Sequence, residues 1–390
     1  MDIRAIEKAV ARRYDDYVET LRAMVDVDCG TYILEGVNEI ADMCAERFRA
    51  AGWEVERRQH RPAEGEHQLG DCVIDRLSGD GGPRVLLIGH TDTVFPDGTA
   101  SERPFRVEDG KALGPGVSDM KGGLLAGFFA VEALQEIGSL PFDSVTYVCN
   151  PDEEIGSPFS GPLIRDLAGE ADVAFVLEAA RENGDIVSAR KGVSDARVDI
   201  SGRAAHAGVE PERGRSAVLE AAHKTLALHA LNGRWPGVTV NVGVIRGGTR
   251  PNVVAERCEL AVDIRGRDER SLRAAEAEVK RIGEEAAVDG TSSAVTLTTW
   301  HRPMERSEAT ARLVETAREI ASSLGFDLRD ASTGGASDAN TTAAAGVPTL
   351  DGLGPVGGRE HGPEEWLDLG SVVPRVSLLA GLLANARVAL

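Results

Sequence analysis

The pattern of apolar positions changes character twice along the chain. In residues 1–190, stretches with an apolar side chain every three or four positions alternate with short, nearly continuous apolar runs. The first pattern is typical of amphipathic helices, and the second of strands that are buried on both faces. We expect helices at residues 3–24, 37–51 and 122–137, and strands at 71–77, 85–89, 144–150 and 171–180. Because strands alternate with helices, this part of the chain predicts an α/β sheet covered by helices.

The order of the expected elements changes near residue 193. Elements are expected there in the order strand, helix, strand, strand, helix, strand, at residues 196–202, 216–231, 238–245, 256–265, 271–287 and 294–300. This βαββαβ order is that of a ferredoxin-like unit. After "HRP" the α/β character returns, with helices expected at 309–324 and 372–388. We therefore predict a small domain, residues 191–301, inserted into a larger one made of residues 1–190 and 302–390.

Composition narrows the possible partners and compartments. The 390 residues are enough for two domains, and their formal net charge is −20. A polyphosphate partner requires a basic face, so nucleic acid is not expected. The five cysteines include no CxxC pair, the N-terminus lacks the apolar core of a signal peptide, and no segment approaches 18 uninterrupted apolar residues. We expect a cytoplasmic protein with reduced thiols that does not span a membrane.

Polar side chains that can bind metals follow the expected strands or lie in glycine-rich loops. His90 and Asp92 end the run "VLLIGHTD", where a spacing of two places both on one side of an extended chain. The other candidates are Asp119 in "GPGVSDMKGG", Glu153 and Glu154 in "NPDEEIGS", Glu178 in "ADVAFVLEA", and His361 in "GGREHGPEEW". Because ligands of open α/β sheets gather at the carboxyl ends of strands, we expect these residues to converge.

The donor set indicates which metal the site would bind. Two histidines and several carboxylates suit zinc, with manganese or cobalt as substitutes. Their number exceeds one tetrahedral shell, so the pattern predicts two metals that share a carboxylate. His90 is then a ligand, and Asp92, on the same side of the chain, fixes its tautomer. Each residue taken alone also has an ordinary structural explanation, such as a turn residue or a solvated surface pair.

Six motifs in chain order match one known family. They are "GHTDTVFP", "GPGVSDMKGG", "NPDEEIGS", "SGRAAHAG", "GGTRPNVV" and "TGGASDAN". Over nearly its whole length the chain resembles the glutamate carboxypeptidase and aminoacylase family of two-metal amidohydrolases. The resemblance implies a mixed-sheet α/β zinc-peptidase catalytic domain, here residues 1–190 and 302–390. It also implies that the ferredoxin-like domain, residues 191–301, is a lid through which two subunits form a homodimer.

The resemblance further implies a ligand set for two Zn²⁺ ions per subunit. His90 and Glu178 would hold one zinc ion, and Glu154 and His361 would hold the other. Asp119 would bridge the two ions. Co²⁺ or Mn²⁺ would be the expected substitutes.

Other residues receive roles from the same resemblance. Glu153 would be the general base that takes a proton from the metal-bridging water. His206 in "SGRAAHAG" would reach the site of a second subunit and donate a hydrogen bond to the oxyanion. Arg302 in "HRPM" would bind a free carboxylate of the substrate, assisted by Asn252 and the backbone of Gly335.

The function implied is hydrolysis of an amide bond in a small peptide or N-acyl amino acid, which releases an amino acid with a free carboxylate. Glutamate-specific relatives place a lysine beyond the counterpart of Glu178, whereas this chain has Arg181 there and no lysine. Two alternatives remain: a deacylase of N-acetyl or N-succinyl amino acids, and a non-catalytic relative that binds a metabolite. The presence of Glu153 disfavours the non-catalytic relative, because a binding protein needs no base beside a metal.

Overall fold

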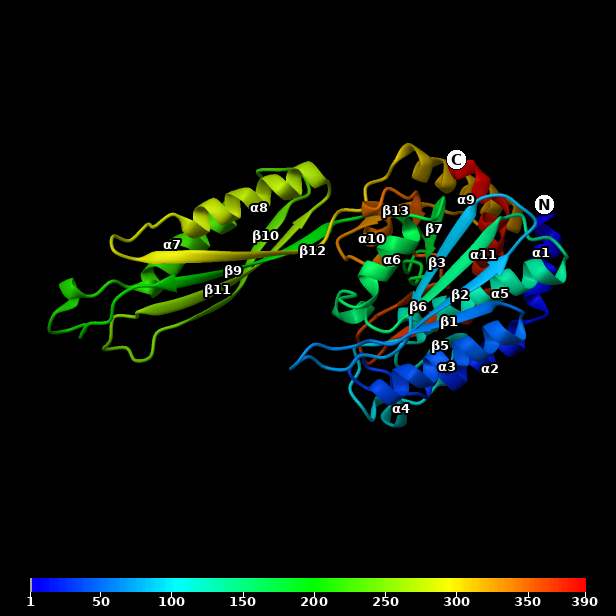
Figure 1. Ribbon diagram of the computed structural model, residues 1–390, viewed down its shortest axis with the longest axis horizontal. Coiled ribbons are helices and arrows are strands. Elements are labelled where there is room, and N and C mark those ends of the chain that lie inside the picture. The colour runs from blue at the N-terminus through cyan, green and yellow to red at the C-terminus, as the bar shows by residue number, and fades with distance from the viewer. Residues whose placement is uncertain (1) are drawn as a thin grey trace. The chain divides into compact units, whose positions relative to one another are not determined.

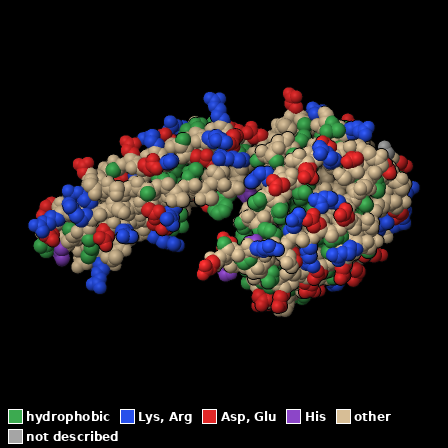
Figure 2. Space-filling model, viewed as in Figure 1, with side chains coloured by type: hydrophobic (Ala, Val, Ile, Leu, Met, Phe, Trp, Pro, Cys, Tyr) green, Lys and Arg blue, Asp and Glu red, His purple; other side chains and the backbone are tan. Residues whose placement is uncertain are grey.

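The computed structural model describes residues 2–390, which divide into two compact units. Unit 1 contains the described residues up to Ser188 together with Arg306–Ser332 and Ser337–Leu390. Unit 2 contains Ala189–Glu305 and Thr333–Ala336, so it is inserted into unit 1 along the chain. On the face shown in Figure 2, basic and acidic side chains are intermingled over both units.

A mixed six-stranded sheet forms the centre of unit 1 (Figure 1). Its order is β1 (Glu54–Arg58), β2 (Cys72–Ser78), β6 (Ser144–Asn150), β3 (Arg84–His90), β7 (Val173–Val176) and β14 (Thr349–Leu350). Strands β6, β3, β7 and β14 are parallel, and β1 and β2 are antiparallel additions at one edge. The carboxyl ends of β3, β6 and β7 therefore lie next to one another.

Helices cover this sheet because its strands are apolar on both faces. The helices of unit 1 are α1 (Ile3–Ala11), α2 (Tyr14–Val25), α3 (Leu34–Ala50), α4 (Thr99–Glu102), α5 (Gly123–Glu136), α6 (Ser160–Ala168), α9 (Glu308–Leu324), α10 (Asp338–Ala344) and α11 (Val372–Asn385). In β3, Val85 and Leu87 belong to the main apolar core with α3, α5 and α11, and Leu86 and Ile88 are buried on the opposite face. Smaller sheets comprise β15 (Gly357–Gly358), β16 (Trp366–Asp368), β5 (Lys111–Leu113) and β4 (Arg106–Glu108), and the pair β8 (Ile186–Arg190) with β13 (Asp330–Thr333).

Unit 2 has the strand and helix order of a ferredoxin-like unit. Its elements are β9 (Gly192–Ser201), α7 (Ala217–His229), β10 (Thr239–Gly247), β11 (Arg257–Gly266), α8 (Glu269–Glu284) and β12 (Ser292–His301). The sheet order is β10-β11-β9-β12, and every pair is antiparallel. Alternate residues of β9, Ala196, Val198 and Ile200, pack into one core with apolar side chains of α7 and α8. This alternation is the reason that a period of two was visible in the sequence.

Two of the expected elements differ from the observed ones. The helix expected over residues 3–24 is two helices, separated at Arg12 and Arg13. Both arginines pair with Glu136 of α5, and Nη1 of Arg13 donates to the carbonyl of Ala9 in the last turn of α1. The strand expected over 171–180 is limited to β7, so Glu178 lies two residues beyond the strand. The regular apolar spacing continued across both boundaries and did not reveal them.

The stretch Leu369–Ala389 is the single one within residues 2–390 that is long and apolar enough to cross a membrane by length and composition. It is 67% buried, and its helix α11 packs against α1, α5 and α9. A core helix of a globular protein has the same composition, so this stretch is weak evidence for a membrane segment.

Candidate metal centre

The predicted ligands of unit 1 meet at the carboxyl edge of the main sheet. His90 is the last residue of β3 and is 1% exposed. Glu153 and Glu154 lie in a single 3₁₀ turn, Glu153–Ile155, shortly after β6, and Glu178 follows β7. Since β3 is hydrogen-bonded to both β6 and β7, the side chains that follow these three strands are neighbours.

Asp119 lies between the two histidines. Its Oδ1 is 3.1 Å from Nε2 of His90, and its Oδ2 is 3.1 Å from Nε2 of His361. Asp119 belongs to an irregular turn, Val117–Gly122, that precedes α5, and its φ and ψ of −112° and 94° are not helical. Each carboxylate oxygen therefore faces a different imidazole, which is the arrangement that a bridging carboxylate requires.

The remaining carboxylates complete two groups around this aspartate. Oε2 of Glu154 is 3.2 Å from Nε2 of His361, and Oε1 of Glu178 is 3.8 Å from Nε2 of His90. Donor atoms of His90, Asp119 and Glu154 all lie within 4.8 Å of one another, and so do those of His90, Glu153 and Glu178. The second group includes Glu153, so its geometry alone permits Glu153 to be a ligand as well as a base.

Asp92 connects the histidine to the glutamate turn. The ring Nδ1 of His90 lies 2.9 Å from the carbonyl oxygen of Asp92 and 3.4 Å from its Oδ1. The carboxylate of Asp92 accepts hydrogen bonds from Oγ1 of Thr31 at 2.7 Å and from the backbone N–H groups of Glu153 and Glu154 at 3.2 and 3.3 Å. With Nδ1 engaged in this way, Nε2 of His90 is left to face Asp119 and Glu178.

Electrostatics at the site reflect an excess of acidic groups. Burial opposes protonation of His90, but hydrogen bonds to Asp119 and Asp92 outweigh it and raise its pKa well above the ordinary value. Hydrogen bonds to Asp119 and Glu154 raise the pKa of His361 to about 11. Burial, with Glu178 nearby, raises the pKa of Glu153. Closely spaced carboxylates in a buried site need positive charge, from protons or from cations.

One buried atom supports the view that this charge is supplied by metal. Oε1 of Glu154 is fully buried and has no hydrogen-bond partner within residues 2–390. An unpartnered buried carboxylate oxygen is costly unless it binds a cation. With two imidazoles and the surrounding carboxylates, it belongs to a donor set that suits zinc, cobalt or manganese. The residues present therefore fit divalent metal ions.

The other predicted site residues belong to unit 2. His206 and Asn252 are exposed and lie in paired loops, since the backbone N–H of Ala207 donates to the carbonyl of Asn252 at 3.0 Å. Gly335 is also exposed, and its carbonyl accepts from Nη1 of Arg190 at 3.1 Å. No hydrogen bond joins Gly335 to these two loops within residues 2–390.

Arg302 has acidic neighbours that the sequence did not reveal. Its Nη1 is 3.3 Å from Oε2 of Glu276 and 3.6 Å from Oε1 of Glu269, both on α8. Glu276 is buried and also accepts hydrogen bonds from Ser194 and Thr299. A carboxylate that binds Arg302 must therefore compete with carboxylates that already neutralise the guanidinium.

Glu365 is a residue of the site that sequence reasoning missed. Its carboxylate is 1% exposed and accepts hydrogen bonds from the backbone N–H groups of Gly116, Ser118 and Asp119. Burial raises its pKa to about 7. In the sequence Glu365 follows another glutamate, Glu364, and nothing in the motif "HGPEEW" distinguishes the buried residue from the exposed one.

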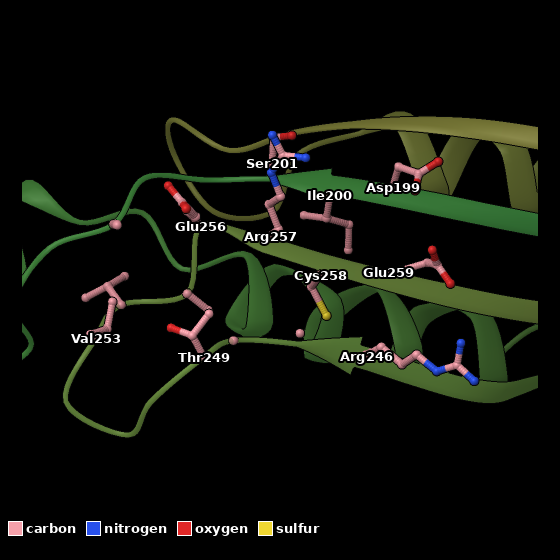
Figure 3. Close-up of a pocket in the computed structure, with 15 residues that line it drawn as sticks. Asp199, Ile200, Ser201, Arg246, Thr249, Val253, Glu256, Arg257, Cys258 and Glu259 are labelled. Atoms are coloured by element: carbon pink, nitrogen blue, oxygen red, sulfur yellow. The ribbon is translucent and has the colours of Figure 1, made fainter.

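A separate pocket of about 480 Å³ lies in unit 2 (Figure 3). It is formed by the ends of β9, β10 and β11 and the loop after β10, and its charged lining residues have both signs. Figure 3 shows Arg246 and Glu259 on neighbouring strands and Arg257 near Ser201. The lining contains none of the predicted ligands or substrate-binding residues.

Comparison with known proteins identifies the family. Residues 86–385 match the model of peptidase family M20/M25/M40. The chain belongs to this family. It is 28% identical over 374 residues to carboxypeptidase G2 of Pseudomonas sp. (strain RS-16), which covers 94% of this chain and 88% of that protein. It is 29% identical over 238 residues to acetylornithine deacetylase of Myxococcus xanthus. That alignment covers 58% of this chain and 61% of the deacetylase.

A solved structure confirms the predicted fold class. The structure of aminopeptidase PepT from Bacillus cereus has a TM-score of 0.82 and 26% identity, and the match covers 97% of this chain and 99% of that one. The mixed α/β fold expected from the sequence is thus confirmed, as is the family resemblance. The protein is a metal-dependent hydrolase of the M20 peptidase class.

Proposed function

We propose that the protein hydrolyses an amide bond of a small peptide or N-acyl amino acid and releases an amino acid with a free carboxylate. The observation that supports this best is Asp119, whose two oxygens face two different histidines at 3.1 Å each. Similarity over most of the chain to carboxypeptidase G2 supports the carboxypeptidase assignment. The five cysteines are all unpaired and buried, which supports a cytoplasmic location.

In this proposal five residues would hold two zinc ions. His90 and Glu178 would bind one ion, Glu154 and His361 would bind the other, and Asp119, whose oxygens face both histidines, would be the shared ligand. When bound, two divalent ions polarise the substrate carbonyl and make a water molecule acidic near neutral pH.

Glu153 acts as the general base and then the general acid. It takes a proton from the attacking water and gives it to the leaving nitrogen. Its raised pKa, caused first by burial and then by Glu178, suits a group that must bind and release a proton. Asp92 orients both partners, because it contacts the ring of His90 and the backbone N–H of Glu153. His206 of a second subunit donates a hydrogen bond to the oxyanion.

The free carboxylate of the substrate is bound by Arg302, with Asn252 and the backbone of Gly335 as further donors. Because Arg302 lies beside Glu276 and Glu269, a substrate carboxylate has to displace one ion pair to form another. This exchange favours substrates that present a full negative charge over amides or esters. A deacylase of N-acyl amino acids is the second candidate, and the similarity to acetylornithine deacetylase supports it.

We further propose that the protein is a homodimer that pairs through unit 2. In residues 2–390, β10 is hydrogen-bonded on one side only, to β11, so its other edge is open. Val218, Leu219 and Leu226 of α7 and Ile245 of β10 are large apolar side chains that are 41–73% exposed. An open strand edge beside exposed apolar side chains is a surface that a twofold copy can cover.

The proposed reaction is tested by metal reconstitution followed by a substrate screen. Protein stripped of metal is loaded with zinc, cobalt or manganese and analysed for metal content, and two equivalents per chain are expected. The loaded forms are then assayed on dipeptides, N-acetyl and N-succinyl amino acids, and the same compounds with an amidated carboxylate. Hydrolysis of none of them by a form that holds two metals would contradict the proposed activity.

The cross-subunit role of His206 has its own test. His206→Ala and Glu153→Ala are each expected to be nearly inactive. Loss of the oxyanion donor His206 should lower turnover by about 100-fold or more. When the two variants exchange subunits, a mixed dimer has one site with both residues intact, so part of the activity should return. If exchange is demonstrated and activity stays absent, His206 does not act across the interface.

A further inference from the structure

A buried carboxylate lies directly behind the turn that contains Asp119. Oε2 of Glu365 accepts a hydrogen bond from the backbone N–H of Gly116 at 3.0 Å. Its Oε1 accepts from the N–H groups of Ser118 at 2.8 Å and Asp119 at 3.0 Å. A single side chain thus pairs three backbone donors of one turn.

These donors need an acceptor because the backbone of the turn is irregular. Gly116 has a φ of 71°, in the left-handed region that glycine tolerates, and Asp119 has a non-helical φ and ψ. Buried N–H groups outside regular structure are costly when they are unpaired. Glu365 supplies the missing acceptor, and in doing so it holds the N–H of the residue whose two oxygens face His90 and His361.

The exposed neighbour Glu364 shows that this placement is specific. The side chain of Glu364 is 71% exposed and pairs with Arg359. Glu365, one residue later, points inward beside β16 and is almost fully buried. Two adjacent glutamates therefore differ in burial and in what they contact, so Glu364 provides a matched control for Glu365.

We propose that Glu365 is a positioning residue of the metal centre: it fixes the backbone of residues 116–119 so that the oxygens of Asp119 reach two metal ions at once. This inference rests on the proposed function, because it requires that Asp119 is the shared ligand. Glu365 touches neither substrate nor metal in this proposal. It acts through Asp119, so its loss should appear as weaker binding of one metal rather than as loss of the base.

The test measures metal affinity in Glu365→Gln and Glu364→Gln by competition with a chromophoric chelator. In Glu365→Gln, one carboxylate oxygen is replaced by an NH₂ group, which donates hydrogen bonds and cannot accept them. At least one backbone N–H of the turn therefore loses its acceptor. We expect the dissociation constant of one of the two metals to rise by about 10- to 100-fold. Glu364→Gln should change it less than twofold. The Co²⁺-loaded form of Glu365→Gln should also show an altered visible absorption spectrum.

A double-mutant cycle separates positioning from general structural support. In an Asp119→Asn background the shared ligand is already impaired, so adding Glu365→Gln should weaken metal binding by less than about threefold more. If the dissociation constant of the double variant rises by the product of the two single-variant factors, Glu365 does not act through Asp119 and the proposal is overturned. If Glu365→Gln does not fold, as judged by circular dichroism, Glu365→Asp is measured in the same cycle, because it keeps the charge and retracts it by one methylene.

The outcomes distinguish this inference from the proposed function. If the unaltered protein binds fewer than two metals, the two-metal proposal fails. If it binds two, and Glu365→Gln binds two with unchanged affinity and an unchanged cobalt spectrum, only the role of Glu365 is wrong.

Discussion

Adjacent glutamates with different proposed roles offer the sharpest test of the site. Glu154 has one oxygen 3.2 Å from His361, and its other oxygen is buried and has no hydrogen-bond partner among the residues that the structure describes, as expected for a ligand. Glu153 lies near His90 and Glu178, in a group that could itself hold a metal. Replacing each by glutamine changes charge and basicity but hardly changes volume, so the fold should be kept in both variants.

The expected losses follow from these positions. Glu153→Gln removes the proton carrier, and general base catalysis typically contributes 10²- to 10⁴-fold, or about 3–5 kcal/mol of transition-state stabilisation. Its metal content should stay at two equivalents. Glu154→Gln leaves one ion with only Asp119 and His361, so that ion should be lost on dialysis, and excess zinc should restore part of the activity.

The assay combines kcat at saturating zinc with elemental analysis of dialysed protein. Two results would refute the reasoning about Glu153. A variant that loses one metal would show that Glu153 is a ligand, as its distance to His90 and Glu178 permits. A variant with two metals and a kcat within threefold of the unaltered protein would show that another group carries the proton.

Three further predictions concern substrate, stability and metal. Arg302→Ala should lower kcat/KM for free-carboxylate substrates by a factor that corresponds to roughly 2–4 kcal/mol of transition-state stabilisation. Glu276→Gln should lower KM for the same substrates, because it removes a carboxylate that competes for Arg302. Equal rates of the unaltered enzyme on acid and amide substrates would contradict both expectations. Burial raises the pKa of Asp75 to about 8, above the unfolded value of about 3.9, so the folded state binds the extra proton and stability should fall as pH rises from about 4 to 8. Asp75→Asn should remove this contribution, so the pH slope should become shallower and the variant should be more stable than the unaltered protein at pH 8, by at most about 5 kcal/mol in urea unfolding; an unchanged pH slope would contradict this. Chelation should lower the melting temperature, since a site at 1,000 times its dissociation constant adds about 4 kcal/mol, and the drop should be smaller in Glu154→Gln.

Periodicity alone located most of the helices and strands. The period of two in β9 and the spacing of about 3.6 in α9 follow from which side of each element is buried, and this information is local. The same local information placed His90 at the end of a buried strand and made it a ligand candidate. The predicted helix over residues 3–24 was wrong at Arg12 and Arg13, where α1 ends and both arginines pair with Glu136, which is more than 120 residues away in the chain.

Only the tertiary structure decided how the site residues meet. Parallel pairing of β3 with β6 and β7 brings His90 to Glu154 and Glu178, and the fold of the C-terminal loop brings His361 to the other oxygen of Asp119. The burial of Glu365 and the pairing of Arg302 with Glu276 were likewise invisible in the sequence. A charged side chain has the same local pattern whether it faces water or three backbone N–H groups, because its partner is chosen by packing between distant segments.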